Sequence, residues 1–270
     1  MSYQKMAVCY DTQSCIKCFA CIVSCSTENR MRLQRDYNYS VEKSMVEPHH
    51  HLNYLRVECN EKGTFPNVTQ IAAFKHCQHC ENPKCMDICP TLAISKKDTG
   101  AVVIDADKCI GCQSCKDACP YDVPVFSKDN GKTYKCTMCH DRLTAELPTA
   151  CSAACPSVAI FSGPADEVIA EAEKRAEHYS KVFNKEYFVY GADKVNNTIG
   201  TLSYMTIAPI ENRDDYLLPA DPSNGVAASR EVAKVVGAAA MIGTAAAIAG
   251  HAVYTAVKYD DKHHKENENE

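Results

Sequence analysis

The spacing of hydrophobic residues predicts one amphipathic helix in the second half of the chain. Val168, Ala172, Ala176 and Tyr179 recur at the spacing of a single helix face within residues 165–182, and alanine and glutamate are frequent between them. We expect this helix to pack beside the part of the chain that precedes it.

Other stretches predict shorter or less regular structure. Residues 54–58 and 101–105 have the composition of short strands. Residues 186–225 contain turn signals and little periodicity, which predicts a surface-running extension or a linker arm.

Near the C-terminus, the 23 residues between Lys234 and Lys258 carry no charge. At about 1.5 Å per residue, a helix of this length spans roughly 34 Å, enough to cross the hydrocarbon core of a bilayer. Its small residues, such as Gly243, Ala247 and Gly250, allow close packing against another membrane helix, and a buried helix in a soluble complex is the alternative. The predicted parts are a cysteine-rich domain at 1–163, an extension at 164–229, a transmembrane helix at 230–258 and a charged tail at 259–270.

Composition indicates metal binding. The 270 residues include 18 cysteines, and 16 of these fall into four tight groups, unlike the scattered cysteines of a small disulfide-bonded domain. The net charge of −5 gives no basic field of the kind that nucleic-acid binding needs. The first residues show neither a basic and apolar leader nor a twin-arginine pair, so we expect no export signal of the chain's own.

The four cysteine groups have the spacing of iron–sulfur ligands. They are Cys15, Cys18, Cys21 and Cys25; Cys77, Cys80, Cys85 and Cys89; Cys109, Cys112, Cys115 and Cys119; and Cys136, Cys139, Cys151 and Cys155. Three thiolates on one tight loop can reach three irons of a cubane cluster, and the fourth cysteine points away to a neighbouring cluster. Proline follows the last cysteine in three groups and turns the chain sharply there. Ser26 takes that place in the first group, so the bend there must be made otherwise.

Other metal ligands are possible. Pairs of C-x2-C units can hold zinc, although a zinc site does not need a third cysteine two residues further on. Cys9 and Cys59 lie outside the groups, and we interpret them as buried thiols. The histidine run at 49–51 is either a metal site or an incidental loop sequence, as are His263 and His264.

Three stretches of the chain resemble a known family. They read HCQHCENPKCMDICPTLAI, then TGAVVIDADKCIGCQSCKDACPYDVPVF, then KCTMCHDRL followed by PTACSAACPSVAI. They resemble the four-cluster iron–sulfur (beta) subunits of molybdopterin oxidoreductases, such as dimethyl sulfoxide reductase, formate dehydrogenase-N and polysulfide reductase, with relatives in membrane hydrogenases. The resemblance covers residues 5–163. Beyond it, TIGTLSYMTIAP and YLLPADP ahead of the apolar segment are similar to the formate dehydrogenase-N and hydrogenase-2 branch, whose members end in a membrane anchor.

The resemblance implies an α+β fold of two tandem ferredoxin-like modules, each with two clusters, a C-terminal extension and one transmembrane helix. It also implies a crossed set of ligands, in which each group lends its last cysteine to another group's cluster. The implied ligands are Cys15, Cys18, Cys21 and Cys155 at site 1; Cys136, Cys139, Cys151 and Cys25 at site 2; Cys77, Cys80, Cys85 and Cys119 at site 3; and Cys109, Cys112, Cys115 and Cys89 at site 4. In nitrate reductase relatives a tryptophan takes the place corresponding to Cys112 and a [3Fe–4S] cluster results. This chain has no tryptophan, so four [4Fe–4S] clusters are expected.

The resemblance predicts a non-catalytic electron-transfer subunit. It would relay electrons between a large pterin-binding catalytic subunit and an integral membrane cytochrome b or quinone-binding subunit surrounded by lipid. One alternative places the same relay in a nickel–iron hydrogenase, and another is a zinc-binding scaffold tethered to a membrane. Five lysines beside the cysteines would raise cluster potentials or are ordinary solvated side chains; they are Lys75, Lys84, Lys108, Lys116 and Lys135.

The expected location is the bacterial inner membrane, crossed once. More lysines follow the apolar segment than precede it, which favours clusters on the periplasmic side. The chain would then be exported together with a signal-bearing partner. His251, the one strongly polar residue within the segment, is either a functional group near a partner's haem or quinone or an interfacial histidine.

Overall fold

The computed structural model describes residues 5–35, 54–128 and 130–222, together with four residues near the C-terminus. It divides into a compact unit from Met1 to Asn224 and a second unit from Gly225 to Glu270. In the second unit the described residues are helical; they are Ile242, Thr244, Ile248 and Ala249. The rest of the predicted transmembrane segment, His251, the charged tail and the histidines at 49–51 lie outside the described residues. Among the described helices, none combines the length and the apolar character needed to cross a membrane.

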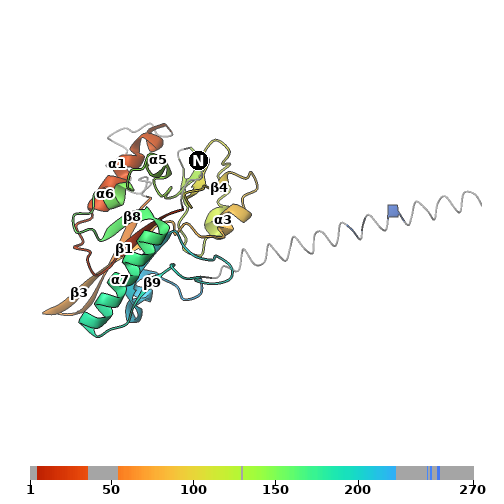
Figure 1. Cartoon of the computed structure of the whole chain (residues 1–270). Helices are drawn as coiled ribbons and strands as arrows, with labels where there is room; N and C mark the ends of the chain where they lie inside the picture. The colour runs from red at the N-terminus through yellow and green to blue at the C-terminus, as the bar shows by residue number, and fades with distance from the viewer. Residues whose placement is uncertain are drawn as a thin grey trace, which may run out of the picture. The chain divides into compact units, whose positions relative to one another are not determined.

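A four-stranded sheet forms the centre of the first unit (Figure 1). Its strands, in spatial order, are β8 (Ile160–Pro164), β1 (Met6–Asp11), β10 (Tyr204–Pro209) and β9 (Tyr187–Tyr190). β1 runs parallel to β10 and antiparallel to β8, and β9 is antiparallel to β10. Val8 pairs with Tyr204, so this sheet joins the beginning of the chain to its later part.

The described part of this segment, residues 186–222, therefore does not form the surface-running extension or linker arm that we predicted. β10 is buried along its whole length in the middle of the sheet, and β9 pairs with it. A strand that is covered on both faces is apolar throughout and lacks the alternation by which a half-exposed strand is predicted. Two short 3-10 helices follow β10; they are η2 (Ile210–Asn212) and η3 (Asp214–Tyr216).

The two faces of the sheet have different partners. Because side chains alternate along a strand, Ala7 and Cys9 of β1 point to one face and Val8 and Tyr10 to the other. Helix α7 (Ala165–Phe183) packs on the first face and confirms the helix predicted at 165–182. Figure 1 shows this helix lying along the sheet beside β8, β1 and β9.

Helices that carry cysteines, or directly follow one, lie on the other face. They are α1 (Ala20–Arg35), α5 (His140–Thr144) and α6 (Ala150–Ala153). Cys21 and Cys25 of α1 pack in one core cluster with Val8, Tyr10 and Tyr204 of the sheet. The sheet thus separates α7 from the cysteines of the first and fourth groups.

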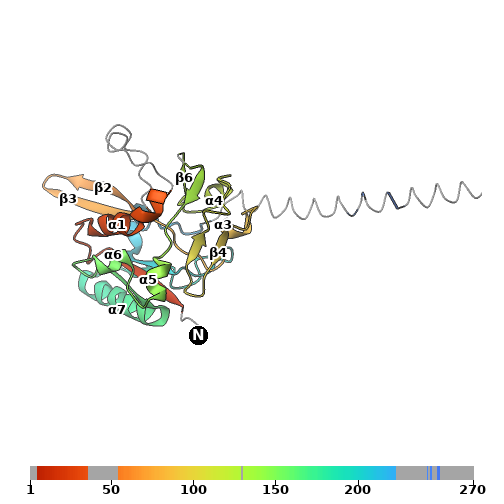
Figure 2. The same ribbon diagram turned by 90° about the horizontal axis from the view of Figure 1, so that it is seen from above.

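Three hairpins complete the unit. β2 (Arg56–Thr64) and β3 (Asn67–Lys75) form a long hairpin that projects to one side, and the strands predicted at 54–58 and 101–105 overlap β2 and β5. On the other side lie two short hairpins and two short helices (Figures 1 and 2). These are β4 (Ile94–Lys96) with β5 (Val102–Ile104), β6 (Val125–Ser127) with β7 (Lys132–Tyr134), α3 (Lys84–Asp87) and α4 (Ser114–Asp117).

Candidate iron–sulfur sites

The first C-x2-C unit of each group turns through a residue in the left-handed region. The third residue of the unit has a positive φ in all four groups: 58° at Lys17, 49° at His79, 69° at Gly111 and 55° at Met138. In three groups the amide of this residue donates to the sulfur of the first cysteine, at 3.4 Å for Cys77, 3.4 Å for Cys109 and 3.3 Å for Cys136. Such N–H···S bonds orient a thiolate and stabilise its negative charge.

The proline that follows a group's last cysteine makes a second repeated turn. The third residue after the cysteine has a positive φ at Leu92, Asp122 and Val158, and its N–H donates to the cysteine's carbonyl. In the first group no such bend is made. Without a proline after Cys25, helix α1 continues to Arg35.

Two cavities bring together cysteines that lie far apart in the sequence. The first, the site 1 cavity, is lined by Cys15, Cys18, Cys21 and Cys155. The second, the site 2 cavity, is lined by Cys25, Cys136, Cys139 and Cys151. Apolar side chains form much of the remaining wall, among them Phe74 and Ile160 at the first cavity and Leu55 and Met138 at the second. Each cavity therefore offers four thiols in an apolar surrounding.

The other eight cysteines are neighbours in two sets. Burial, together with the nearby thiols of Cys77 and Cys119, raises the pKa of Cys80 well above its ordinary value. Burial also raises the pKa of Cys115 to about 11, with Cys109 and Cys89 among the neighbouring thiols that contribute. Each set thus includes the last cysteine of the other group.

The electrostatics of these thiols suit a metal. Burial raises the pKa of Cys21 and Cys25 to about 12, because a lone thiolate is unfavourable away from water. Iron that takes the place of the proton supplies the missing positive charge. At Cys89 burial acts in the same direction, but the Thr91 hydroxyl and the Ala93 amide outweigh it and lower the pKa of this thiol.

Two polar side chains at the site 2 cavity were not predicted from the sequence. Tyr204 of β10 and His76, which directly follows β3, both line it, with ring centroids 3.7 Å apart. The Tyr204 hydroxyl is buried and has no hydrogen-bond partner among the described residues, so it can donate to a cluster sulfur. Burial lowers the pKa of His76 to about 4, and its Nδ1 lies 3.0 Å from the Cys77 carbonyl, to which it can donate.

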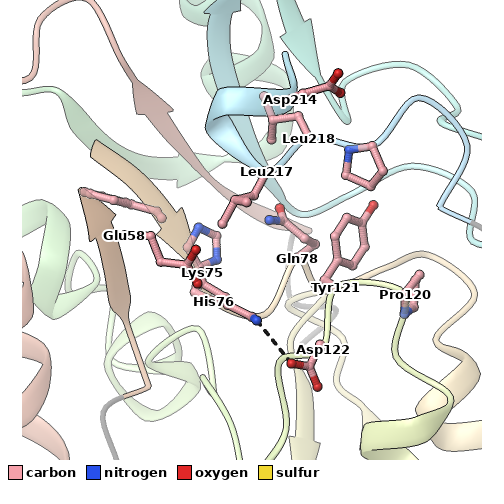
Figure 3. A pocket seen from close by; sticks show the side chains of 12 residues that line it. Glu58, Lys75, His76, Gln78, Pro120, Tyr121, Asp122, Asp214, Leu217 and Leu218 are labelled. Atoms are coloured by element: carbon pink, nitrogen blue, oxygen red, sulfur yellow. Dashed lines mark hydrogen bonds and ion pairs between the residues drawn. The ribbon is translucent and has the colours of Figure 1, made fainter. Parts of the chain in front are cut away.

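An open pocket of about 350 Å³ lies beside these sites (Figure 3). His76 lines both this pocket and the site 2 cavity, so its ring belongs to the wall between them. Lys75 crosses the pocket to an ion pair with Asp122 at 3.1 Å. Leu217 and Leu218 face it from the segment after η3.

The two cysteines outside the groups differ from each other. Cys9 is fully buried beneath α7, as expected. Cys59 is exposed on β2, so our interpretation of it as a buried thiol was wrong. Most of the β2 residues are exposed because this strand has a single neighbour, β3, and projects from the unit.

Comparison with known proteins agrees with these sites. Residues 68–164 match the family model of a 4Fe–4S dicluster domain. The formate dehydrogenase iron–sulfur subunit of Haemophilus influenzae is 30% identical over 273 residues, which cover 96% of this chain and 85% of that relative. The chain therefore belongs to the same family of oxidoreductase iron–sulfur subunits as this relative. This iron–sulfur subunit is also similar to a subunit of sulfite dehydrogenase from Allochromatium vinosum, at 35% identity over 59% of this chain and 68% of the relative. The nitrate-inducible formate dehydrogenase iron–sulfur subunit of Escherichia coli is 28% identical over 89% of this chain and 82% of its own length.

Membership of this family establishes the cofactor and the general role. The protein binds 4Fe–4S clusters and transfers electrons, and its fold is mixed α and β with a 4Fe–4S dicluster domain. The cofactor supplies the one-electron chemistry, and the chain supplies ligands, hydrogen bonds to sulfur and an apolar surrounding.

Proposed function

We propose that this iron–sulfur subunit holds four [4Fe–4S] clusters in two ferredoxin-like modules and has no catalytic site of its own. It relays electrons between a large pterin-binding catalytic subunit and a quinone-reactive subunit in the membrane. The ligands are those of sites 1 to 4 as defined above. The single observation that carries this proposal is the pair of cavities, each lined by three cysteines of one group and the last cysteine of the other.

A second observation supports electron entry and exit at sites 1 and 4. Cys18 at site 1 and Cys112 at site 4 are exposed, whereas every cysteine of sites 2 and 3 is at least partly buried. Ile16 and Ile110 hold equivalent places in the two groups, and each has 64% of its surface exposed. Exposed apolar side chains beside an exposed ligand are what a docked partner subunit would cover.

The proposed ligand map is tested by replacing single cysteines. The complete chain should contain about sixteen irons, four per cluster, and no stoichiometric zinc. Cys155→Ser should remove or alter the cluster at site 1 and leave the one held by Cys136, Cys139 and Cys151. The exposed Cys59→Ser is the matched control and should keep the full iron content. Loss at site 2 instead of site 1 would refute the crossed assignment.

The membrane part of the proposal rests on the uncharged segment at 235–257. We place it across the bacterial inner membrane beside the quinone-reactive partner, with the clusters on the periplasmic side. A chain that ends at residue 229 should keep its irons and leave the membrane fraction when the partners are absent. Retention in that fraction would show that the segment is not the anchor.

A further inference from the structure

Lys135 stands apart from the other lysines beside cysteines because its side chain is buried. It follows β7 and precedes Cys136, and only 4% of its surface is exposed. Its ammonium group donates to the carbonyl of Cys136 at 3.2 Å and to the carbonyl of Val102 in β5. Neutral carbonyls satisfy the N–H donors, but a buried charge also requires a charge of opposite sign nearby.

The other four lysines have carboxylate partners. Lys75 and Lys116 pair with Asp122, Lys84 with Asp87 and Lys108 with Asp105, at 3.1 to 4.0 Å. Between 17% and 65% of each of these side chains is exposed. Within residues 5–35, 54–128 and 130–222, Lys135 forms no ion pair with a carboxylate.

The charges that face Lys135 are cysteine sulfurs. The ammonium group of Lys135 forms a hydrogen bond with the sulfur of Cys77, and it lies close enough to the sulfurs of Cys85, Cys136 and Cys119 to act on them electrostatically. In the proposed map, Cys136 belongs to site 2, whereas Cys77, Cys85 and Cys119 belong to site 3. Lys135 therefore faces ligands of sites 2 and 3, and these two sites belong to different modules.

We propose that Lys135 is a shared counter-charge for the clusters at sites 2 and 3, which raises both of their reduction potentials and favours electron passage between the two modules. This inference rests on the proposed ligand map. When an electron passes, one [4Fe–4S] cluster is oxidised by one electron and the other is reduced by one. The step moves one electron only, so no proton or bond is exchanged. A reduced cluster carries one more negative charge, and a fixed ammonium in a medium of low dielectric constant stabilises it.

The test compares neutral and charged replacements in the full chain purified with its partners. Lys135→Gln removes the charge and keeps a hydrogen-bond donor, and Lys135→Arg keeps the charge. The matched control is Lys75→Gln, because Lys75 also stands close before a cysteine but pairs with Asp122 at the open pocket (Figure 3). Iron per chain and potentiometric titration followed by electron paramagnetic resonance are the two measurements.

We expect Lys135→Gln to keep its irons and to shift two of the four potentials downwards. Lys135→Arg should leave those two potentials near the parent values, and Lys75→Gln should shift them less than Lys135→Gln does. Loss of iron at sites 2 or 3 in Lys135→Gln but not in Lys135→Arg would also show that the charge is required. Unchanged potentials in an iron-replete Lys135→Gln protein, or equal iron loss in both variants, would overturn the inference. Failure of the ligand map itself would appear separately, in the iron content of the parent protein and in the Cys155→Ser variant.

Discussion

The two pairs of cysteine sites are built in different ways. Sites 1 and 2, which we call the sheet-side sites, combine cysteines from the first group with cysteines from the fourth, and they close against the central sheet. Sites 3 and 4, the hairpin-side sites, draw on the segment between Cys77 and Cys119 and pack against short local hairpins. The sheet-side sites depend on long-range strand pairing, whereas the hairpin-side sites depend more on turn geometry, although residues 78–82 of the second group also pair with residues 199–204. A substitution in the sheet should therefore affect one pair and spare the other.

The largest effect is expected at Asp11, the last residue of β1. This fully buried carboxylate accepts N–H bonds from Gln13 and Ser14, a hydroxyl bond from Tyr179 and an ion pair from Arg175. It fixes the start of the loop that carries Cys15. Asp11→Ala removes the central acceptor of this buried network and should lower the free energy of unfolding by about 3–5 kcal/mol. We expect a lower Tm and loss of iron from the sheet-side sites, measured by calorimetry and iron analysis.

The surface pair of Glu177 and Lys181 on α7 provides the control for Asp11. Glu177→Gln should leave the Tm and the iron content close to those of the parent protein, because exposed ion pairs contribute little. If Asp11→Ala removed iron from the hairpin-side sites as readily as from the sheet-side sites, the two pairs would not be independent.

The next effect concerns Gly111 at site 4. A Cβ at this residue would lie 1.9 Å from the carbonyl oxygen of Gly131, and φ is +69°. Gly131 has a similar φ of +68°, but a Cβ there would meet nothing within 4 Å. Gly131→Ala should cost about 1 kcal/mol from the backbone conformation alone. Gly111→Ala should cost more and loosen the cluster at site 4 while the sheet-side sites keep their iron; equal effects of the two variants would contradict the clash.

A smaller effect is expected from Tyr204→Phe in β10. The substitution keeps the ring and removes the buried hydroxyl at the site 2 cavity. One hydrogen bond is worth about 0.5–1.5 kcal/mol, and it is stronger to the more negative, reduced cluster. The potential at site 2 should fall, with the other three unchanged, in a potentiometric titration. Tyr187→Phe, whose hydroxyl bonds to Gln13 at the surface, is the control and should shift none of them.

The smallest effect is a dependence on acid at Asp215 in η3. Hydrogen bonds from Asn212 and Lys62 lower the pKa of this carboxyl below 3.8, its ordinary value. The unfolded chain therefore takes up the proton first, and this stabilisation is present above pH 3.8 and is lost as the pH falls further. Asp215→Asn should lower the free energy of unfolding by about 0.2–1 kcal/mol at neutral pH. It should also reduce the fall in Tm that accompanies a decrease in pH below 3.8. An acid limb identical to that of the parent would argue against the contact with the β2–β3 hairpin.

Sequence patterns predicted some of these features for clear physical reasons. Helix α7 was found because one of its faces is buried and the other is solvated, which leaves a periodic pattern. The cysteine groups were found because cluster ligands require fixed spacings. β10 was missed because it is buried at every position and pairs with β1, a strand from the opposite end of the unit. The hydrophobic pattern within a short stretch of sequence gives no information about a partner strand so far away along the chain.

The five lysines beside cysteines show the same limit at the scale of single residues. Each stands within two residues of a ligand, and the sequence offers no means to rank them. Their burial ranks them, since Lys135 is buried and donates to the Val102 carbonyl of β5, while the Lys108 side chain is 65% exposed. Burial depends on contacts between segments that are distant along the chain.

The parallel pairing of β1 with β10 has a consequence for the order in which the protein is made. β1 leaves the ribosome first, but its neighbours β8 and β10 follow only after all four cysteine groups have been synthesised. The hairpin-side sites have all their thiols once Cys119 has emerged, whereas Cys15, Cys18 and Cys21 must wait for Cys155. Iron delivered during synthesis would therefore fill the middle of the chain before its beginning, and the first group would wait longest for its cluster and need protection from oxidation for longest.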